Sequence, residues 1–282
     1  MKVALETTNA CSASCRFCGR TKLDLRSKGH MSNAVFERFL CLLADYNDKE
    51  PVVALSTHFG DVTCHPDLAG IIRKIGGVEG VTGVSFFTNG ILLDKHDLSG
   101  LPIHHVDFST SVGAEQYQRL YGSDQYNLAM TNILIFLSQE AIPAKVLLRV
   151  DKPFKSVKKH PDYKHLTKWI RKKNVKFLDE WDDFQGVIKQ VDLPLGASFR
   201  IPPLKSKICH HLNRRLLVWK DGEVSVGCRP HQEFIVGHVF KFSLQDMANG
   251  PAQQIVDDWA EDKYPYPCRD CLSYQPIRKW RW

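Results

Sequence analysis

Apolar, β-branched stretches alternate with amphipathic segments along the first two thirds of the chain. Six of these stretches predict strands, at Lys2–Thr7, Val52–Thr57, Val81–Thr88, Ile103–Ser109, Lys145–Val150 and Val175–Leu178. Apolar residues at helical spacing predict helices after Ser32, near Asp67, over Tyr126–Ser138 and near Asp162–Lys173. This alternation is typical of βαβ units and a parallel sheet, and six units fit an open, partial (β/α)6 TIM barrel in the α/β class.

The alternation stops at about Gln185, and prolines such as Pro194 and Pro202 indicate a linker. Two apolar stretches then flank Asp221-Gly222, which predicts a hairpin with an Asp-Gly turn. Ser243 to Asp246 fits a capping box before a further helix. We therefore expect two domains: a barrel over residues 1–184, and a linker with a small hairpin-plus-helix domain over residues 185–282.

Composition narrows the class of protein. The chain has 282 residues, of which 43% are hydrophobic, as in a globular protein with a core. No apolar run approaches the ~18 residues of a membrane span, and the N-terminus lacks a signal-peptide pattern. We expect a cytoplasmic protein, where nine cysteines indicate metal or redox chemistry rather than disulfides.

Positive charge is concentrated in one segment. Residues 145–176 hold twelve Lys and Arg residues against Asp151 and Asp162, so this basic segment carries +10 while the whole chain carries +7. The favoured interpretation is a solvated helix face, because most charge runs are solvated. The alternative is a docking surface for an acidic partner or an anionic substrate.

Three cysteines follow the first predicted strand within eight residues: Cys11, Cys15 and Cys18. Thiols this close predict a loop around one metal centre, and soft thiolates favour iron–sulfur or zinc. Structural zinc takes four protein ligands, whereas the next cysteine, Cys41, is expected to be a small core residue of the first helix. Three thiolates on a four-iron cluster would leave one iron open.

Four more cysteines surround the predicted hairpin, and they are Cys209, Cys228, Cys268 and Cys271. Four thiols form a closed ligand set, which fits structural zinc and a four-iron cluster equally well. From the residues alone, both metals stay open at this second site.

Taken together, these features resemble the radical S-adenosylmethionine (SAM) superfamily. The first cysteine loop matches its C-x3-C-x2-C motif, with the aromatic Phe17 before the last cysteine. Further matches follow in chain order: Gly60-Asp61, with Asp where the family has Glu, then Thr88-Asn89, Ser109 with Ser111, and Arg149. The resemblance implies a [4Fe-4S] cluster whose open iron binds SAM, and a 5′-deoxyadenosyl radical that takes a substrate hydrogen.

The resemblance also implies roles for these residues. Phe17, Gly60, Thr88, Asn89, Ser109 and Ser111 would line the SAM site. Asp61 would bind the methionyl amine, although it is one methylene shorter than Glu, and Arg149 would bind the carboxylate. The four later cysteines resemble the twitch form of the SPASM domain, which implies an auxiliary [4Fe-4S] cluster and therefore two clusters in all.

Within that group the chain resembles 2-deoxy-scyllo-inosamine dehydrogenase-type enzymes. This implies an oxidoreductase for a small polar molecule, such as a sugar or cyclitol, that passes an electron to the auxiliary cluster. Asp183 and Gln185 follow the sixth strand and are the candidates for substrate contact. A flavodoxin or ferredoxin type of reductant is the expected partner, and the alternative interpretation of the basic segment makes it the docking surface for that reductant. No membrane or nucleic acid is expected.

Two other functions remain open. One is peptide modification, by epimerisation or cross-linking, for which Cys64 is the candidate hydrogen donor. The cysteine loop begins at residue 11, so we expect no leader-binding domain before it, which favours the small substrate. The other is a zinc-binding protein that contacts RNA through the basic segment.

Overall fold

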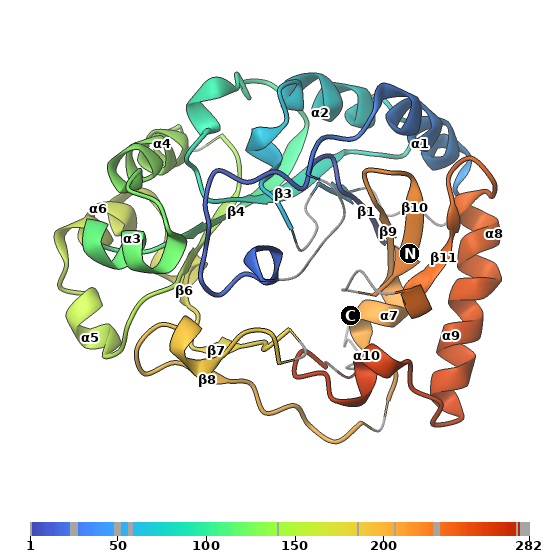
Figure 1. Ribbon diagram of the computed structural model, residues 1–282. Helices are drawn as coiled ribbons and strands as arrows, with labels where there is room; N and C mark the ends of the chain where they lie inside the picture. Colours follow the sequence, from blue (N-terminus) through green and yellow to red (C-terminus); the bar gives the residue numbers. More distant parts are fainter. Residues whose placement is uncertain are drawn as a thin grey trace.

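A curved sheet of nine strands forms the centre of the molecule (Figure 1). The computed structural model describes residues 2–22, 28–47, 52–55, 59–139, 141–184, 186–205, 207–227, 232–274 and 276. The strand order is β11-β10-β9-β1-β2-β3-β4-β5-β6. The first strand of the chain therefore lies inside the sheet, between the next strand of the sequence and a strand from the C-terminal part.

Six parallel strands make up the larger part of this sheet, as the alternating pattern predicts. Their bounds are β1 Lys2–Leu5, β2 Val52–Ala54, β3 Gly83–Thr88, β4 Ile103–Thr110, β5 Ala144–Leu148 and β6 Val175–Phe177. Val84, Val106 and Val146 are fully buried, because helices cover one face of a parallel sheet and its own curvature encloses the other. The predicted partial barrel is confirmed.

Helices line the outer, convex side of the strands (Figure 1). They are α1 Asn33–Asp45, α2 Leu68–Gly76, α3 Ala114–Tyr121, α4 Tyr126–Ser138, α5 Phe154–Val157 and α6 Pro161–Trp169. The first two begin where a side chain can accept a backbone N–H: Ser32 accepts from Val35, and Asp67 accepts from Gly70. Short 3-10 helices are η1 Gly19–Thr21, η2 Val62–Cys64, η3 Leu93–Lys95, η4 Lys172–Asn174, η5 Gln190–Asp192 and η6 Gln232–Phe234.

One residue of α1 departs from the prediction. Cys41 is exposed rather than a small core residue. The face of α1 that meets the sheet carries Phe39, Leu42 and Leu43, and the helical repeat turns position 41 to the opposite side.

The C-terminal part continues the same sheet with its last three strands, whereas its first two strands pair with each other in a separate two-stranded sheet. Its elements are β7 Glu180–Trp181, β8 Ser198–Phe199, α7 His210–Arg214, β9 Arg215–Val218, β10 Glu223–Val226, β11 Ile235–His238, α8 Leu244–Asn249, α9 Pro251–Ala260 and α10 Tyr266–Arg269. The predicted hairpin is β9–β10, which is antiparallel, and Ser243 caps α8. However, β9 also pairs in parallel with β1, from Lys2 opposite Arg215 to Leu5 opposite Val218.

The described ranges contain no candidate for a membrane-spanning helix. None of their helices combines the length and apolar character that crossing a bilayer requires.

Candidate functional site

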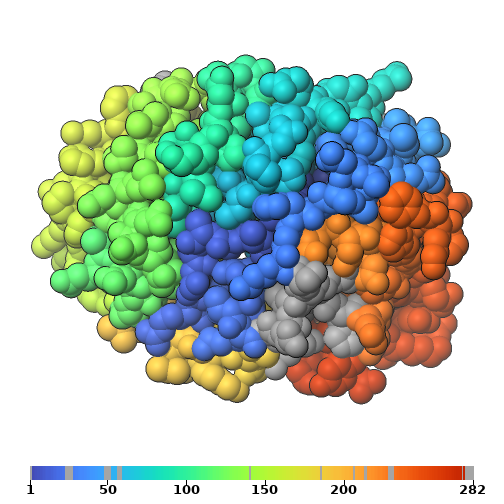
Figure 2. Space-filling model, turned by 45° about the horizontal axis from the view of Figure 1, so that its top comes forward, coloured from blue at the N-terminus to red at the C-terminus, as the bar shows by residue number. Residues whose placement is uncertain are grey.

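The predicted cofactor residues gather at the carboxyl ends of the parallel strands. The loop after β1 carries the three cysteines across this end of the barrel, and Figure 2 shows it at the centre of one face, beside green and yellow segments. The end of α3 holds it, because Ser14 N–H donates to the Tyr121 carbonyl at 2.9 Å and Arg16 N–H donates to the Leu120 carbonyl at 3.0 Å. From the other side, Lys22 forms a 3.0 Å ion pair with Asp192.

The three thiols are partly buried in this loop. Burial is the largest cause that raises the pKa of Cys11, to about 12, and it also raises the pKa of Cys15. Among the described residues, no three His, Cys, Asp or Glu side chains come close enough to share one metal ion. A four-iron cluster makes no such demand, because each thiolate binds a different iron, so the three-thiol set fits that group.

Asp61 joins the ends of two strands. Its side chain is buried and accepts four hydrogen bonds: from Thr63 N–H at 3.0 Å, Thr63 Oγ1 at 2.7 Å, Thr88 Oγ1 at 2.9 Å and Asn89 N–H at 2.7 Å. Both carboxylate oxygens are engaged, so Asp61 fixes the loops after β2 and β3 against each other.

Asn89 carries this network to the cysteine loop. Its Nδ2 donates to Ser12 Oγ at 3.2 Å and lies 3.8 Å from Cys11 Sγ. Gly60 permits the close approach of the two loops, because its φ is +92° and a Cβ there would lie 2.6 Å from the Thr8 carbonyl oxygen. One wall beside Cys11 is thus formed by Gly60 and Asp61, which follow β2, and by Thr88 and Asn89, at the end of β3.

Arg149, just after β5, is clamped between two rings. Its guanidinium lies 4.7 Å from the ring centres of both Phe17 and Trp181. Its Nε donates to Ser109 Oγ at 2.9 Å, and that hydroxyl lies 3.0 Å from the Tyr121 hydroxyl. Stacking and hydrogen bonding hold a positive charge beside the cysteine loop, where it opposes the rise in the pKa of Cys15.

Ser111 and Cys64 occupy different positions. Ser111 is fully buried and accepts from Gln116 Nε2 at 2.9 Å, so its hydroxyl is engaged with α3. Cys64 lies at the end of η2 and hydrogen-bonds with Ser12 of the cysteine loop. Burial, followed by the charge of Asp61, raises the pKa of its thiol to about 11.

The predicted substrate segment follows β7. Asp183 is half-buried, and its carbonyl accepts from Ile188 N–H at 2.9 Å. Gln185, the other predicted residue, lies outside the described residues. Trp181 and Phe184 also lie here and were not predicted, because no sequence motif marks them. The available signal was the aromatic residue that ends a short strand.

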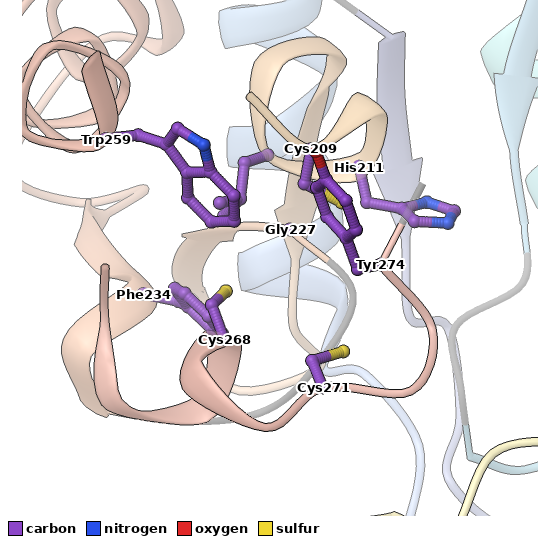
Figure 3. A pocket seen from close by; sticks show the side chains of 9 residues that line it. Cys209, His211, Gly227, Phe234, Trp259, Cys268, Cys271 and Tyr274 are labelled. Carbon is purple, nitrogen blue, oxygen red and sulfur yellow. The ribbon is translucent and has the colours of Figure 1, made fainter. Parts of the chain in front are cut away.

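The second cysteine site is a cavity in the C-terminal part (Figure 3). Three of the four predicted cysteines line it, namely Cys209, before α7, Cys268, on α10, and Cys271, just after α10. All three are buried. Cys228 lies outside the described residues. The structure therefore places Cys209 at the same cavity as Cys268 and Cys271, which come much later in the sequence.

Aromatic residues support this cavity. Trp259 stacks on Tyr274 with ring centres 5.9 Å apart, and the Tyr274 hydroxyl donates to the Lys207 carbonyl at 2.7 Å. Through this hydrogen bond, the segment after Cys271 is fastened to the segment before Cys209. His211 also lines the cavity, and burial lowers its pKa to about 4, so it is neutral near pH 7.

Solved structures show what this arrangement is similar to. BtrN in complex with AdoMet and 2-DOIA matches with a TM-score of 0.60 and 12% identity, over 100% of this chain and 96% of that chain. Native anSMEcpe with bound AdoMet matches with a TM-score of 0.60 and 14% identity, over 91% and 83% of the two chains. Both proteins are radical SAM enzymes. The chain has the radical SAM fold.

A third structure with this radical SAM fold is SuiB of Streptococcus suis bound to S-adenosylmethionine, with a TM-score of 0.60 and 11% identity. The alignment covers 89% of this chain and 66% of SuiB. No protein-family model and no curated protein sequence matches the chain. At these identities the comparison establishes the fold alone.

Proposed function

We propose that the chain is a radical SAM oxidoreductase that acts on a small polar alcohol, such as a sugar or cyclitol. One observation carries the proposal: the loop of Cys11, Cys15 and Cys18 lies at the carboxyl ends of the barrel strands, beside the clamped Arg149. The bound AdoMet in the solved structures of the same fold supports it.

Different residues around the loop would bind the cluster and SAM. Cys11, Cys15 and Cys18 would hold the [4Fe-4S] cluster, and Arg149 would bind the carboxylate of SAM with a guanidinium that is already oriented. Asp61 would keep Asn89 beside Cys11. When bound, the cluster and SAM supply the abstraction of a hydrogen atom from substrate.

The second cysteine site would complete the oxidation. Cys209, Cys268 and Cys271, together with Cys228, would hold an auxiliary cluster. An alcohol that has lost a hydrogen atom becomes a ketone when it loses one proton and one further electron. The auxiliary cluster would accept that electron, and Asp183, in the loop after β7, is the candidate to accept the proton.

Peptide modification is the second candidate function. SuiB has been solved bound to precursor peptide SuiA, and anSMEcpe with a Cp18Cys peptide. Cys64 supports this reading, because its protonated thiol lies beside the first cysteine loop. We favour the small substrate because the chain matches 96% of BtrN, which binds 2-DOIA, but 66% of SuiB.

Metal analysis tests the proposal. After anaerobic reconstitution, the protein should bind about eight irons and eight sulfides per chain, the content of two four-iron clusters. Cys15→Ala and Cys271→Ala should each bind about four, since each removes one ligand set. Cys41→Ala is the matched control, because this cysteine is exposed and distant from both predicted sites in the sequence. Bound zinc without iron in the wild type would overturn the radical chemistry.

Cleavage of SAM provides the second measurement. With dithionite as reductant, the reconstituted wild type should form 5′-deoxyadenosine and methionine. A panel of sugars and cyclitols should then be compared with short peptides for products that depend on SAM. Ketone formation from an alcohol supports the first function, whereas epimerised or cross-linked peptide supports the second.

A further inference from the structure

Phe184 lies between the first cysteine loop and the C-terminal hairpin. Its ring packs on Gly19, the residue after Cys18, so closely that a Cβ on this glycine would lie 2.7 Å from Phe184 Cδ1. On the other side, the ring packs against the buried cluster of Ala4, Phe59, Leu217 and Trp219. One side chain thus fills the space between the loop after β1, the end of β2 and strand β9.

The backbone at Phe184 is held in an unusual conformation. Its φ is +50°, a region that bulky residues seldom adopt, and the surrounding contacts must offset the strain. Asp182 supplies one of them, since its Oδ1 accepts from Phe184 N–H at 3.0 Å. The backbone strain is therefore maintained by a specific side chain in the same loop.

The same aspartate is bonded to the chain segment that follows the second cysteine site. Its Oδ2 accepts from Ser273 Oγ at 2.7 Å, and Ser273 is two residues after Cys271. The Phe184 ring contacts the residue after Cys18, while its loop is bonded to the segment after Cys271. This loop therefore connects the chain segment next to the first cysteine site with the segment next to the second.

We propose that Phe184 is a specificity-determining residue that walls the barrel interior between the two cysteine sites and limits it to small molecules. Asp182 is its positioning residue, tied to the second site by Ser273. This inference rests on the proposed function and specifies its substrate class. An apolar ring at this place also keeps water from the reacting groups, as radical chemistry demands.

The packing itself can be tested without any cofactor. Gly19→Ala should lower the melting temperature by about 2–6 °C, because the added methyl overpacks against the ring. Phe184→Leu removes part of that ring, so the double variant should regain most of the loss. If the two changes in melting temperature simply add in the double variant, residue 19 is not in contact with the Phe184 ring, and the inference fails.

Access to the first site is tested on the reconstituted protein. The probe is bathophenanthroline disulfonate, a bulky iron chelator whose complex is followed by absorbance. Phe184→Ala should speed the release of iron by about tenfold, the effect of lowering a barrier by about 1.4 kcal/mol. Phe240→Ala, which truncates a half-exposed ring after β11, should match the wild type.

The outcomes separate the two proposals. If Phe184→Ala holds both clusters and releases iron at the wild-type rate, the wall is contradicted while the proposed function stands. If the wild type assembles no cluster and cleaves no SAM, the proposed function fails, and this inference fails with it.

Discussion

The carboxylate of Asp61 meets donors from Thr63, Thr88 and Asn89. The resemblance to the radical SAM superfamily predicts that this residue binds the amine of SAM, because it occupies the position where the family has Glu. With both oxygens engaged by the protein, a different role is supported, that of holding the walls of the cofactor site. The shorter side chain is the physical reason, since it keeps the carboxylate close to its own loop.

The Asp61→Asn variant tests that role. Exchanging one carboxylate oxygen for an amide NH2 places a donor opposite donors in a buried position, which should lower the free energy of unfolding by about 1–3 kcal/mol. Urea denaturation of the cluster-free protein measures it. Asp45→Asn, at an exposed position on α1, is the control. Wild-type stability for Asp61→Asn, with weakened binding of SAM, would favour the amine-binding role instead.

His65 makes stability depend on pH. Burial, with His30 and His96 nearby, lowers its pKa below the usual 6.5, while Asp67 opposes the shift. The unfolded chain therefore binds a proton more readily than the folded one, so this residue makes stability fall as the pH drops below about 6.5. In melting experiments between about pH 7 and pH 5.5, His65→Asn should show a shallower decline than the wild type.

A matched control accompanies this measurement. His104 is exposed on β4, and His104→Asn accounts for the loss of a histidine as such. A decline that is equally steep in His65→Asn and in the wild type would show that other groups set the pH dependence.

At the scale of elements, the hairpin β9–β10 depends on a single turn residue. Gly222 has a φ of +91°, and a Cβ there would lie 2.8 Å from His238 Cε1 on β11. The turn therefore serves both the hairpin and the packing of the next strand. The Asp-Gly pair predicted this turn correctly, but it held no information on the neighbour that crowds it.

Gly222→Ala should consequently destabilise the protein by more than Gly100→Ala. Both glycines have a positive φ, +91° and +68°, so both substitutions strain the backbone, whereas nothing lies within 4 Å of a Cβ at Gly100. Overpacking at Gly222 should add about 1–3 kcal/mol to the loss of unfolding free energy. Equal losses in chemical denaturation would mean that His238 moves aside without cost.

Most elements were predictable because their signals are local. Strand periodicity, the Ser32 cap and the Asp-Gly turn each act within a few residues. The parallel pairing of β9 with β1 was not predictable in this way, since it joins Lys2 to Arg215 and no local pattern encodes such a partner. The stacking of Trp181 on Arg149 was missed for the same reason.

For the whole molecule, the distribution of charge suggests how electrons arrive. The basic segment lies over β5, α5, α6 and β6, and Lys158 and Lys159 are exposed on it. An acidic flavodoxin would be attracted to this side of the barrel. The solvated face, which is the interpretation favoured from the sequence, predicts instead that these charges have no effect on turnover.

The double variant Lys158→Glu with Lys159→Glu distinguishes the docking surface from the solvated face. Flavodoxin-driven cleavage of SAM should slow at low salt and lose much of its salt dependence, while dithionite-driven cleavage should stay unchanged. Arg73→Glu with Lys241→Glu applies the same charge change elsewhere, on exposed positions of α2 and after β11. If this control slows the reaction as much, net charge rather than the basic segment is responsible.

The place of β1 inside the sheet also affects how the protein is made. Strand β1 ends at Leu5, but its neighbour β9 begins at Arg215. At a synthesis rate of about 5–20 residues per second, β1 waits roughly 10–40 s on the ribosome for that neighbour. Throughout this interval one edge of β1 and the three thiols that follow it stay accessible, to chaperones and to iron delivery as well as to aggregation. Pairing with β9, which is synthesised late, then covers the open edge of β1.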